Sequence, residues 1–217
     1  MTEIELFPGI WVKIVAFDSM NDQKVVNIEN DIAAQNLCPF CKAGPKDVMD
    51  TTKDFGVDPS YLCELCMSIL HFTIRTFEHF CKIGFKQDVK KFTKLTNEEK
   101  EKVKERTKWV KAEFLKKGLP IFEPRPGGSS NDGNLARDAF KDPEWFASVV
   151  GVPAELMRKI NFIRIALAST LKKNPAKFGQ ICKEAKDIYI ANCKWYPFNP
   201  TLHKILGKFP LHFFKDF

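Results

Sequence analysis

The stretch 37–44, Leu-Cys-Pro-Phe-Cys-Lys-Ala-Gly, holds two cysteines, Cys38 and Cys41, separated by two residues. This spacing lets both sulfurs bind one metal ion. The proline stiffens the turn, and the glycine after the second cysteine lets the chain fold back. A redox-active pair is the rival interpretation, but that motif normally opens a helix within a βαβ pattern. Here the pair follows a strand-like run and leads into a polar loop, so we predict a structural zinc knuckle.

A second pair, Cys63 and Cys66, gives the full pattern C-x2-C-x21-C-x2-C. This spacing is typical of a four-thiolate zinc site. The second pair opens an apolar run, and a helix N-terminus there would favour thiolates over thiols. The alternative is that both cysteines are simply buried at the start of that helix.

The totals limit the class of protein. The chain has 217 residues, is 44% hydrophobic and contains 20 Phe, enough for one large domain or two small ones with a true core. No stretch reaches the roughly 18 consecutive apolar residues of a membrane span. The start, residues 1–5, shows no secretory signal, and the seven cysteines are an odd number. We therefore expect the cysteines to be free thiols or metal ligands rather than disulfides. We also expect no membrane association and a nuclear or cytoplasmic, not secreted, protein.

The charge is unevenly distributed. Residues 1–60 contain 5 Lys/Arg and 10 Asp/Glu, residues 86–117 contain 12 and 6, and residues 155–217 contain 12 and 4. A basic C-terminal half suits phosphate backbones or acidic surfaces. A solvated Lys-rich exterior that keeps the protein soluble is the alternative.

The N-terminal part predicts a small β-hairpin, with strands at 10–17 and 24–28 rich in β-branched and aromatic residues. A Gly- and Pro-containing loop at 42–59 follows. The apolar run 60–83 contains no Gly or Pro and predicts a buried helix. His71 in this run is expected to be a satisfied core histidine.

Capping signals predict the remaining helices. A capping box at Thr96 starts a charged helix that runs to residue 117 and stops at Gly118. Its buried stripe is narrow, and Lys and Glu cover the other faces. Asn or Asp followed by Pro predicts helices at 143–150, 175–192 and 200–206, and another opens at residues 152–153. We predict a mainly α fold: residues 1–118 with hairpin, knuckle and two long helices, a Pro/Gly-rich hinge at 119–134, and a C-terminal helical bundle at 135–217.

Several stretches, in order over most of residues 22–208, resemble a known group of proteins. They are LCPFC (37–41), LHFTIR (70–75), RPGG (125–128), NDGNLAR (131–137), WY (195–196) and HKIL (203–206). The group comprises uncharacterised transposon-derived proteins of arthropods and hydrozoans. These are distantly similar to the zinc-binding region of the V(D)J recombinase catalytic subunit and related transposases.

The resemblance implies a zinc site formed by a CxxC and two later histidines. Cys38, Cys41 and His203 match these positions, but the fourth position is Lys208, whose ammonium cannot bind zinc. His212, or Cys63 with Cys66, could substitute. Both ligand sets stay open, and Cys38 and Cys41 belong to either.

The catalytic carboxylates of that family would lie before residue 1 and after residue 217, so we expect no catalytic residues in this chain. Asp18, Asp22 and Asp132 are expected to form turns and caps rather than bind magnesium. Residues 127–137 could present backbone amides and Arg137 to a phosphate at a helix N-terminus, or could be a loop that ends in Asx caps.

We therefore expect a zinc-stabilised nucleic-acid-binding module with DNA as partner, not an enzyme. The candidate phosphate contacts are basic side chains: Lys90, Lys91, Lys94, Arg125, Arg137, Lys172 and Lys173. The alternative is a protein-interaction or regulatory module that binds a full-length transposase relative or another protein. Its signal is the dense aromatic set Trp195, Tyr196, Phe198, Phe209, Phe213 and Phe214.

Overall fold

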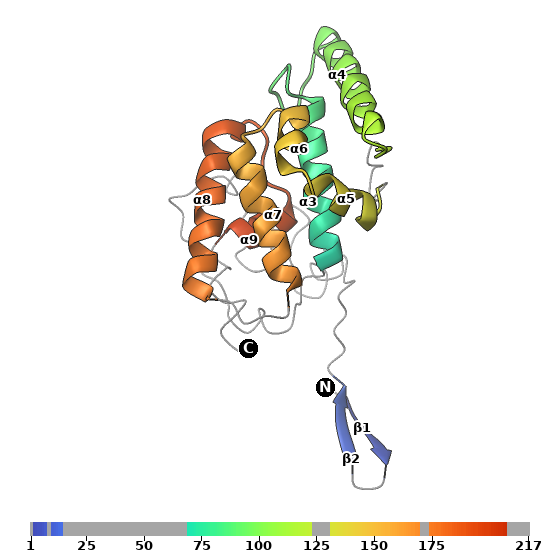
Figure 1. The fold of residues 1–217 in the computed structure, drawn as a ribbon, viewed down its shortest axis with the longest axis vertical. Helices are drawn as coiled ribbons and strands as arrows, with labels where there is room; N and C mark the ends of the chain where they lie inside the picture. The colour runs from blue at the N-terminus through green and yellow to red at the C-terminus, as the bar shows by residue number, and fades with distance from the viewer. Residues whose placement is uncertain (1, 8–9, 15–68, 123–130, 170–173, 208–217) are drawn as a thin grey trace.

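Helix α3 (Ile69–Phe85) is the central element of the helical part of the molecule (Figure 1). The computed structural model describes residues 2–7, 10–14, 69–122, 131–169 and 174–207. Helix α3 packs against α4 (Asn97–Lys116), α5 (Gly133–Phe140), α6 (Pro143–Val150), α7 (Ala154–Ala168) and α9 (Pro200–Leu206), and α8 (Pro175–Cys193) packs against α7 and α9. The predicted mainly α fold is confirmed.

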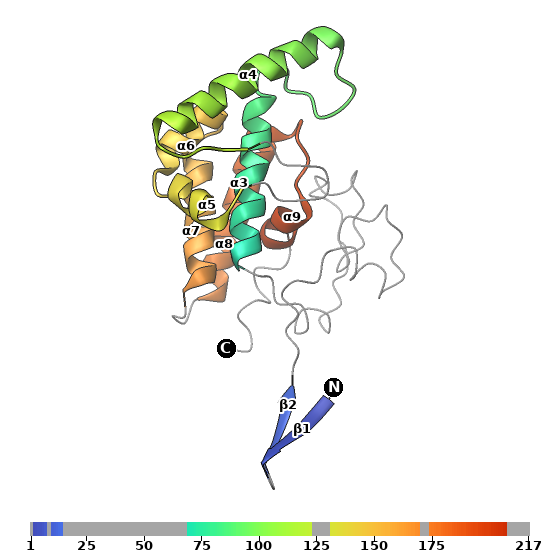
Figure 2. The ribbon, with the colours of Figure 1, turned by 90° about the vertical axis from the view of Figure 1, so that its right-hand side faces the viewer.

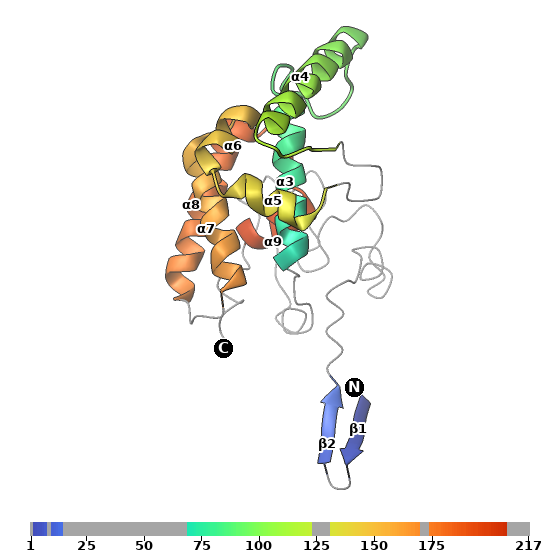
Figure 3. The ribbon, with the colours of Figure 1, turned by 45° about the vertical axis from the view of Figure 1, so that its right-hand side comes forward.

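The helices wrap around α3 rather than forming a simple up-and-down bundle. Helices α7 and α8 lie side by side (Figure 1). Helix α4 crosses the end of the body where α3 meets α6 (Figure 2). Helix α5 lies across α3 (Figure 3). The N-terminal half of α4 and the connection 86–96 therefore project beyond the packed core.

Aromatic rings from four helices form the centre of the core. Phe77 lies 5.8 Å from Phe114 and 5.5 Å from Phe146, measured between ring centroids. Phe146 also meets Phe140 edge-on at 5.3 Å. All four side chains are fully buried. Such contacts stabilise beyond the area that they bury.

The helix starts follow the capping signals. The Thr96 hydroxyl accepts a hydrogen bond from the Glu99 amide, and the Glu99 carboxylate accepts one from the Thr96 amide, so the predicted capping box is confirmed. Asp142, Asn174 and Asn199 cap α6, α8 and α9, each ahead of a first-turn proline. These local bonds satisfy amides that have no partner within the helix.

The hairpin differs from the predicted one. Strand β2 (Ile10–Ile14) lies within the predicted strand 10–17, but it pairs antiparallel with β1 (Thr2–Phe7), which was not predicted. The predicted partner, 24–28, lies outside the described residues. The Pro8-Gly9 dipeptide between the two strands is a turn signal, and it connects β2 to the residues before it.

The two histidines of α3 differ in exposure. The prediction for His71 is wrong, because its side chain is exposed, whereas His79, two turns later, is buried. The position along the helix explains this difference. His71 lies in the first turn of α3, whereas His79 lies in its second half, where every residue from Thr76 to Cys81 is buried.

The predicted division of the chain at 119–134 stays a prediction, but described helices on both sides of that segment share one hydrophobic core. The two described ends of the segment are also tied together. The Asn131 amide group accepts from the Phe122 amide at 2.9 Å, and it donates to the Phe122 carbonyl at 3.0 Å and to Glu78 at 3.3 Å.

None of the described helices combines the length and the apolar character that crossing a membrane requires.

Candidate nucleic-acid interface

The structure describes some of the predicted site residues. Lys90, Lys91 and Lys94 lie in the connection 86–96, Arg137 lies on α5, and His203 lies on α9. The other predicted residues lie outside the described part of the chain: Cys38, Cys41, Cys63, Cys66, Arg125, Lys172 and Lys173.

Two of the loop lysines have an unusual backbone. Lys90 and Lys94 have φ angles of +46° and +58°, in the left-handed region. A side chain with a Cβ disfavours this region by roughly 1–2 kcal/mol per residue. The backbone of the loop therefore uses two lysines where glycine or asparagine would fit better.

Lys91 has a different role from its neighbours. Its ammonium forms an ion pair with the Glu99 carboxylate at 3.2 Å. The Thr96 amide, and then Lys91, hold the pKa of Glu99 below its usual range. Lys91 thus fastens the loop to the capping box of α4, which leaves it less suited to a phosphate.

Four lysines from three segments gather at one end of the body. We call Lys82, Lys86, Lys90 and Lys194 the basic patch. The Lys86 ammonium donates to the Phe92 carbonyl at 2.6 Å and lies 5.7 Å from the Tyr196 ring centroid, beside the end of α8.

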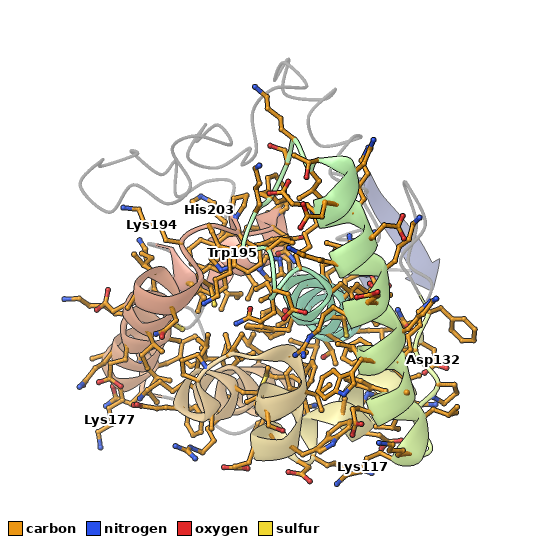
Figure 4. The ribbon with its side chains drawn as sticks, turned by 90° about the horizontal axis from the view of Figure 1, so that it is seen from above. Lys117, Asp132, Lys177, Lys194, Trp195 and His203 are labelled. Carbon is orange, nitrogen blue, oxygen red and sulfur yellow. The ribbon has the colours of Figure 1, made fainter. Side chains whose placement is uncertain are left out.

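The electrostatics agree with this gathering. Burial, and then repulsion from Lys82, lower the pKa of Lys86. Burial raises the pKa of the Cys193 thiol to about 11, and the charge of Lys90 opposes that rise, which puts Lys90 near the residue before Lys194. Figure 4 places Lys194 and Trp195 side by side at this end, far from Lys177.

The basic patch differs from α4 in how its charge is balanced. Lysines of α4 pair within the helix, as Lys102 does with Glu98 at 2.7 Å and Lys104 with Glu101 at 2.6 Å. Among the described residues, no carboxylate lies within ion-pair distance of the four patch lysines, and Asp88 is the sole acidic residue of 86–96. Lys82, Lys90 and Lys194 therefore present their charge to solvent, whereas Lys102, Lys104 and Lys116 of α4 are neutralised within their helix.

Helix α5 offers a weaker anion site than the sequence suggested. The Asp132 carboxylate accepts from the amides of Asn134 and Leu135 at 2.9 and 2.8 Å, so the predicted cap role of Asp132 is confirmed. A carboxylate thus occupies the amides that a phosphate would need. Arg137 is exposed on this helix and lies close enough to Arg164 that its charge lowers the Arg164 pKa, after the larger effect of burial.

His203 is 8% exposed and lies between buried residues of α9. Within the ranges that the structure describes, no three His, Cys, Asp or Glu side chains are grouped so that they could hold a metal ion. The cysteines predicted to join His203 lie outside those ranges. The zinc site therefore stays a prediction.

The sequence analysis missed part of the patch. Lys82, Lys86 and Lys194 were not candidates, because they lie in three segments that only the packing of α3 against α9 and the end of α8 brings together. The sequence does contain one signal for the patch, an aromatic residue directly after a lysine: Phe92 follows Lys91, and Trp195 follows Lys194.

A scan against protein-family models and a search of curated proteins found no match to this chain.

Proposed function

We propose that the protein binds nucleic acid and that the basic patch, together with Lys94 of the connection 86–96, contacts the phosphate backbone. The observation that carries the proposal is the convergence of four lysines from three segments without a carboxylate partner in the described structure. Bringing like charges together costs free energy, and a polyanion would remove that cost. The resemblance to transposon-derived proteins favours DNA as the nucleic acid.

The backbone of the loop adds support. Strained residues persist where the surroundings hold them, and they occur frequently at functional sites. Lys90 and Lys94 keep a left-handed backbone and also carry charges that α4 does not neutralise. Retaining lysine there makes physical sense if the ammonium group, rather than the backbone, is what the position requires.

The test replaces Lys90 and Lys94 together by glycine. Strain relief offsets the backbone entropy of glycine, so the midpoint of thermal unfolding should stay within a few degrees. Affinity for a short oligonucleotide should fall, and the slope of log K against log salt should become shallower by roughly 1.4–1.8, or 0.7–0.9 for each phosphate contact removed. Fluorescence anisotropy over a salt series measures both.

The control removes the same charge from α4, with Lys102→Gln and Lys104→Gln. These side chains form ion pairs with Glu98 and Glu101, so their loss should change the affinity and the salt slope far less. Equal effects of the two double variants would mean that net charge alone attracts the nucleic acid. No measurable binding at low salt would end the proposal.

We retain zinc as part of the proposed function, with Cys38, Cys41, Cys63, Cys66 and His203 as candidate ligands. Purified protein is expected to contain about one zinc per chain, and a chelator should lower its unfolding temperature. Elemental analysis of Cys63→Ser and His203→Ala would decide between the two ligand sets. Metal-free protein with unchanged melting would contradict the site.

The alternative, a protein-interaction module, receives less support from the described residues. Its predicted signal was aromatic density near the C-terminus, yet Tyr196 and Phe198 are only 6% and 3% exposed and belong to the core. They are therefore not available to a partner surface. We propose no catalytic activity for this chain.

A further inference from the structure

An exposed aromatic ring lies beside the basic patch. Phe92, in the loop 86–96, is 42% exposed. Its ring meets the Tyr196 ring edge-to-face, with centroids 5.0 Å apart and an interplanar angle of 88°. The Lys86 ammonium lies 5.3 Å from the Phe92 centroid and also donates to the Phe92 carbonyl.

Trp195 extends this arrangement. It meets Tyr196 at 5.5 Å and 79°, and it is only partly buried. The buried Tyr196 ring thus contacts both Phe92 and Trp195, and each of these edge contacts holds the more exposed ring in position. Because their orientation is held by packing, little conformational entropy would be lost when a ligand contacts them.

The combination of held aromatic rings and unneutralised lysines suits one kind of nucleic acid. Bases of a duplex are stacked on one another, so a surface ring cannot reach their faces. Bases of a single strand can stack on an aromatic side chain while lysines contact the adjacent phosphates. Every base has such a face, so this mode gives little sequence preference.

Resting on the proposed function, we propose that the patch recognises single-stranded nucleic acid, with one base stacked on Phe92 and its flanking phosphates on Lys90 and Lys194. An acidic peptide could also use the lysines, but it would gain no more from a phenyl ring than from another apolar side chain of similar size. The aromatic character of residue 92 therefore separates the two ligands.

The experiment compares a labelled 20-nucleotide oligothymidylate with a 20-base-pair duplex at low salt, for the wild-type chain and for Phe92→Leu. Leucine keeps an apolar contact with Tyr196, so the fold should be retained, which a thermal melt checks. Phe92→Leu should weaken single-strand binding roughly tenfold and leave duplex binding unchanged. The matched control is Phe162→Leu on α7, because that ring is similarly exposed, at 51%, and has no place in the patch. It should change neither affinity.

Each outcome decides something. Tighter binding of the single strand together with a selective loss in Phe92→Leu supports the inference. Equal binding of both ligands, unaffected by Phe92→Leu but weakened by the Lys90 and Lys94 double variant, would overturn the inference and leave the proposed function standing. If polyglutamate at equal charge displaces the oligonucleotide and Phe92→Leu does not change the affinity, the inference would be overturned in favour of an acidic peptide. Binding of neither oligonucleotide would remove the proposed function as well.

Discussion

Replacing Phe77 by alanine is expected to lower the free energy of unfolding by about 3–5 kcal/mol. Phe77 is fully buried, and its ring contacts Phe114 of α4 and Phe146 of α6 at centroid distances of 5.8 and 5.5 Å. Truncation would leave a cavity where three helices meet, and the surrounding rings are too large to fill it. Chemical denaturation followed by far-UV circular dichroism measures the loss.

Phe162→Ala is the matched control, since that ring is about half exposed on α7. It should cost well under 1 kcal/mol, because most surface substitutions change stability by less than about 0.5 kcal/mol. Similar losses for the two variants would mean that the three-helix junction is not the centre of the core.

Acidification is expected to destabilise the protein through His79. Burial, and then the charge of Lys82, lower the pKa of His79 from 6.5 to about 3. The unfolded chain therefore binds a proton on this ring below pH 6.5, whereas the folded protein stays neutral there until about pH 3. The contribution of His79 is complete above pH 6.5 and is lost as the pH falls below that value, by up to about 1.4 kcal/mol per pH unit. Between pH 7 and pH 5 the expected loss is about 2 kcal/mol.

The hydrogen bonds around His79 define its neutral form. The Tyr189 hydroxyl donates to the Tyr196 carbonyl at 2.7 Å, so it accepts the bond from His79 Nε2, at 2.8 Å. The proton of the neutral ring is therefore on Nε2. A second proton would put a charge into a site that Phe80 and the two tyrosines enclose.

His79→Gln provides the comparison, because glutamine can offer an N–H to Tyr189 but does not titrate. The variant should be less stable than the wild type at pH 7, and the difference between the two should shrink as the pH falls to 5. Other groups titrate in both proteins and cancel in this difference. Parallel pH profiles would show that His79 does not carry the acid sensitivity.

Local signals in the sequence predicted most of the helical structure. The Thr96 capping box and the Asn or Asp caps at 142, 174 and 199 predicted helix starts that the structure confirms. These signals work because a cap depends on atoms within three or four residues of each other. Helical periodicity also predicted a buried stripe on α4 of Val103, Thr107, Val110 and Phe114, and the structure buries all of these except Val103, which is partly exposed.

The same reasoning was insufficient wherever a partner distant in sequence decides the outcome. The packing of other helices around the second half of α3, including the contact of His79 with Tyr189 of α8, puts His79 rather than His71 in the core. Strand β2 pairs with β1, which precedes it, because any edge with the right pattern can satisfy its backbone.

The sequence alone determined the helix content, most helix starts, and the basic character of the connection after α3. Only the tertiary structure decided which of those charges lie together: Lys82, Lys86, Lys90 and Lys194 come from segments up to about a hundred residues apart. It also decided that Lys102, Lys104 and Lys116 of α4 are paired with carboxylates, while these four are not paired with any carboxylate among the described residues. The physical reason is that capping and periodicity act over a few residues, whereas electrostatic potential at a surface sums over everything within about 10 Å, whatever its place in the chain.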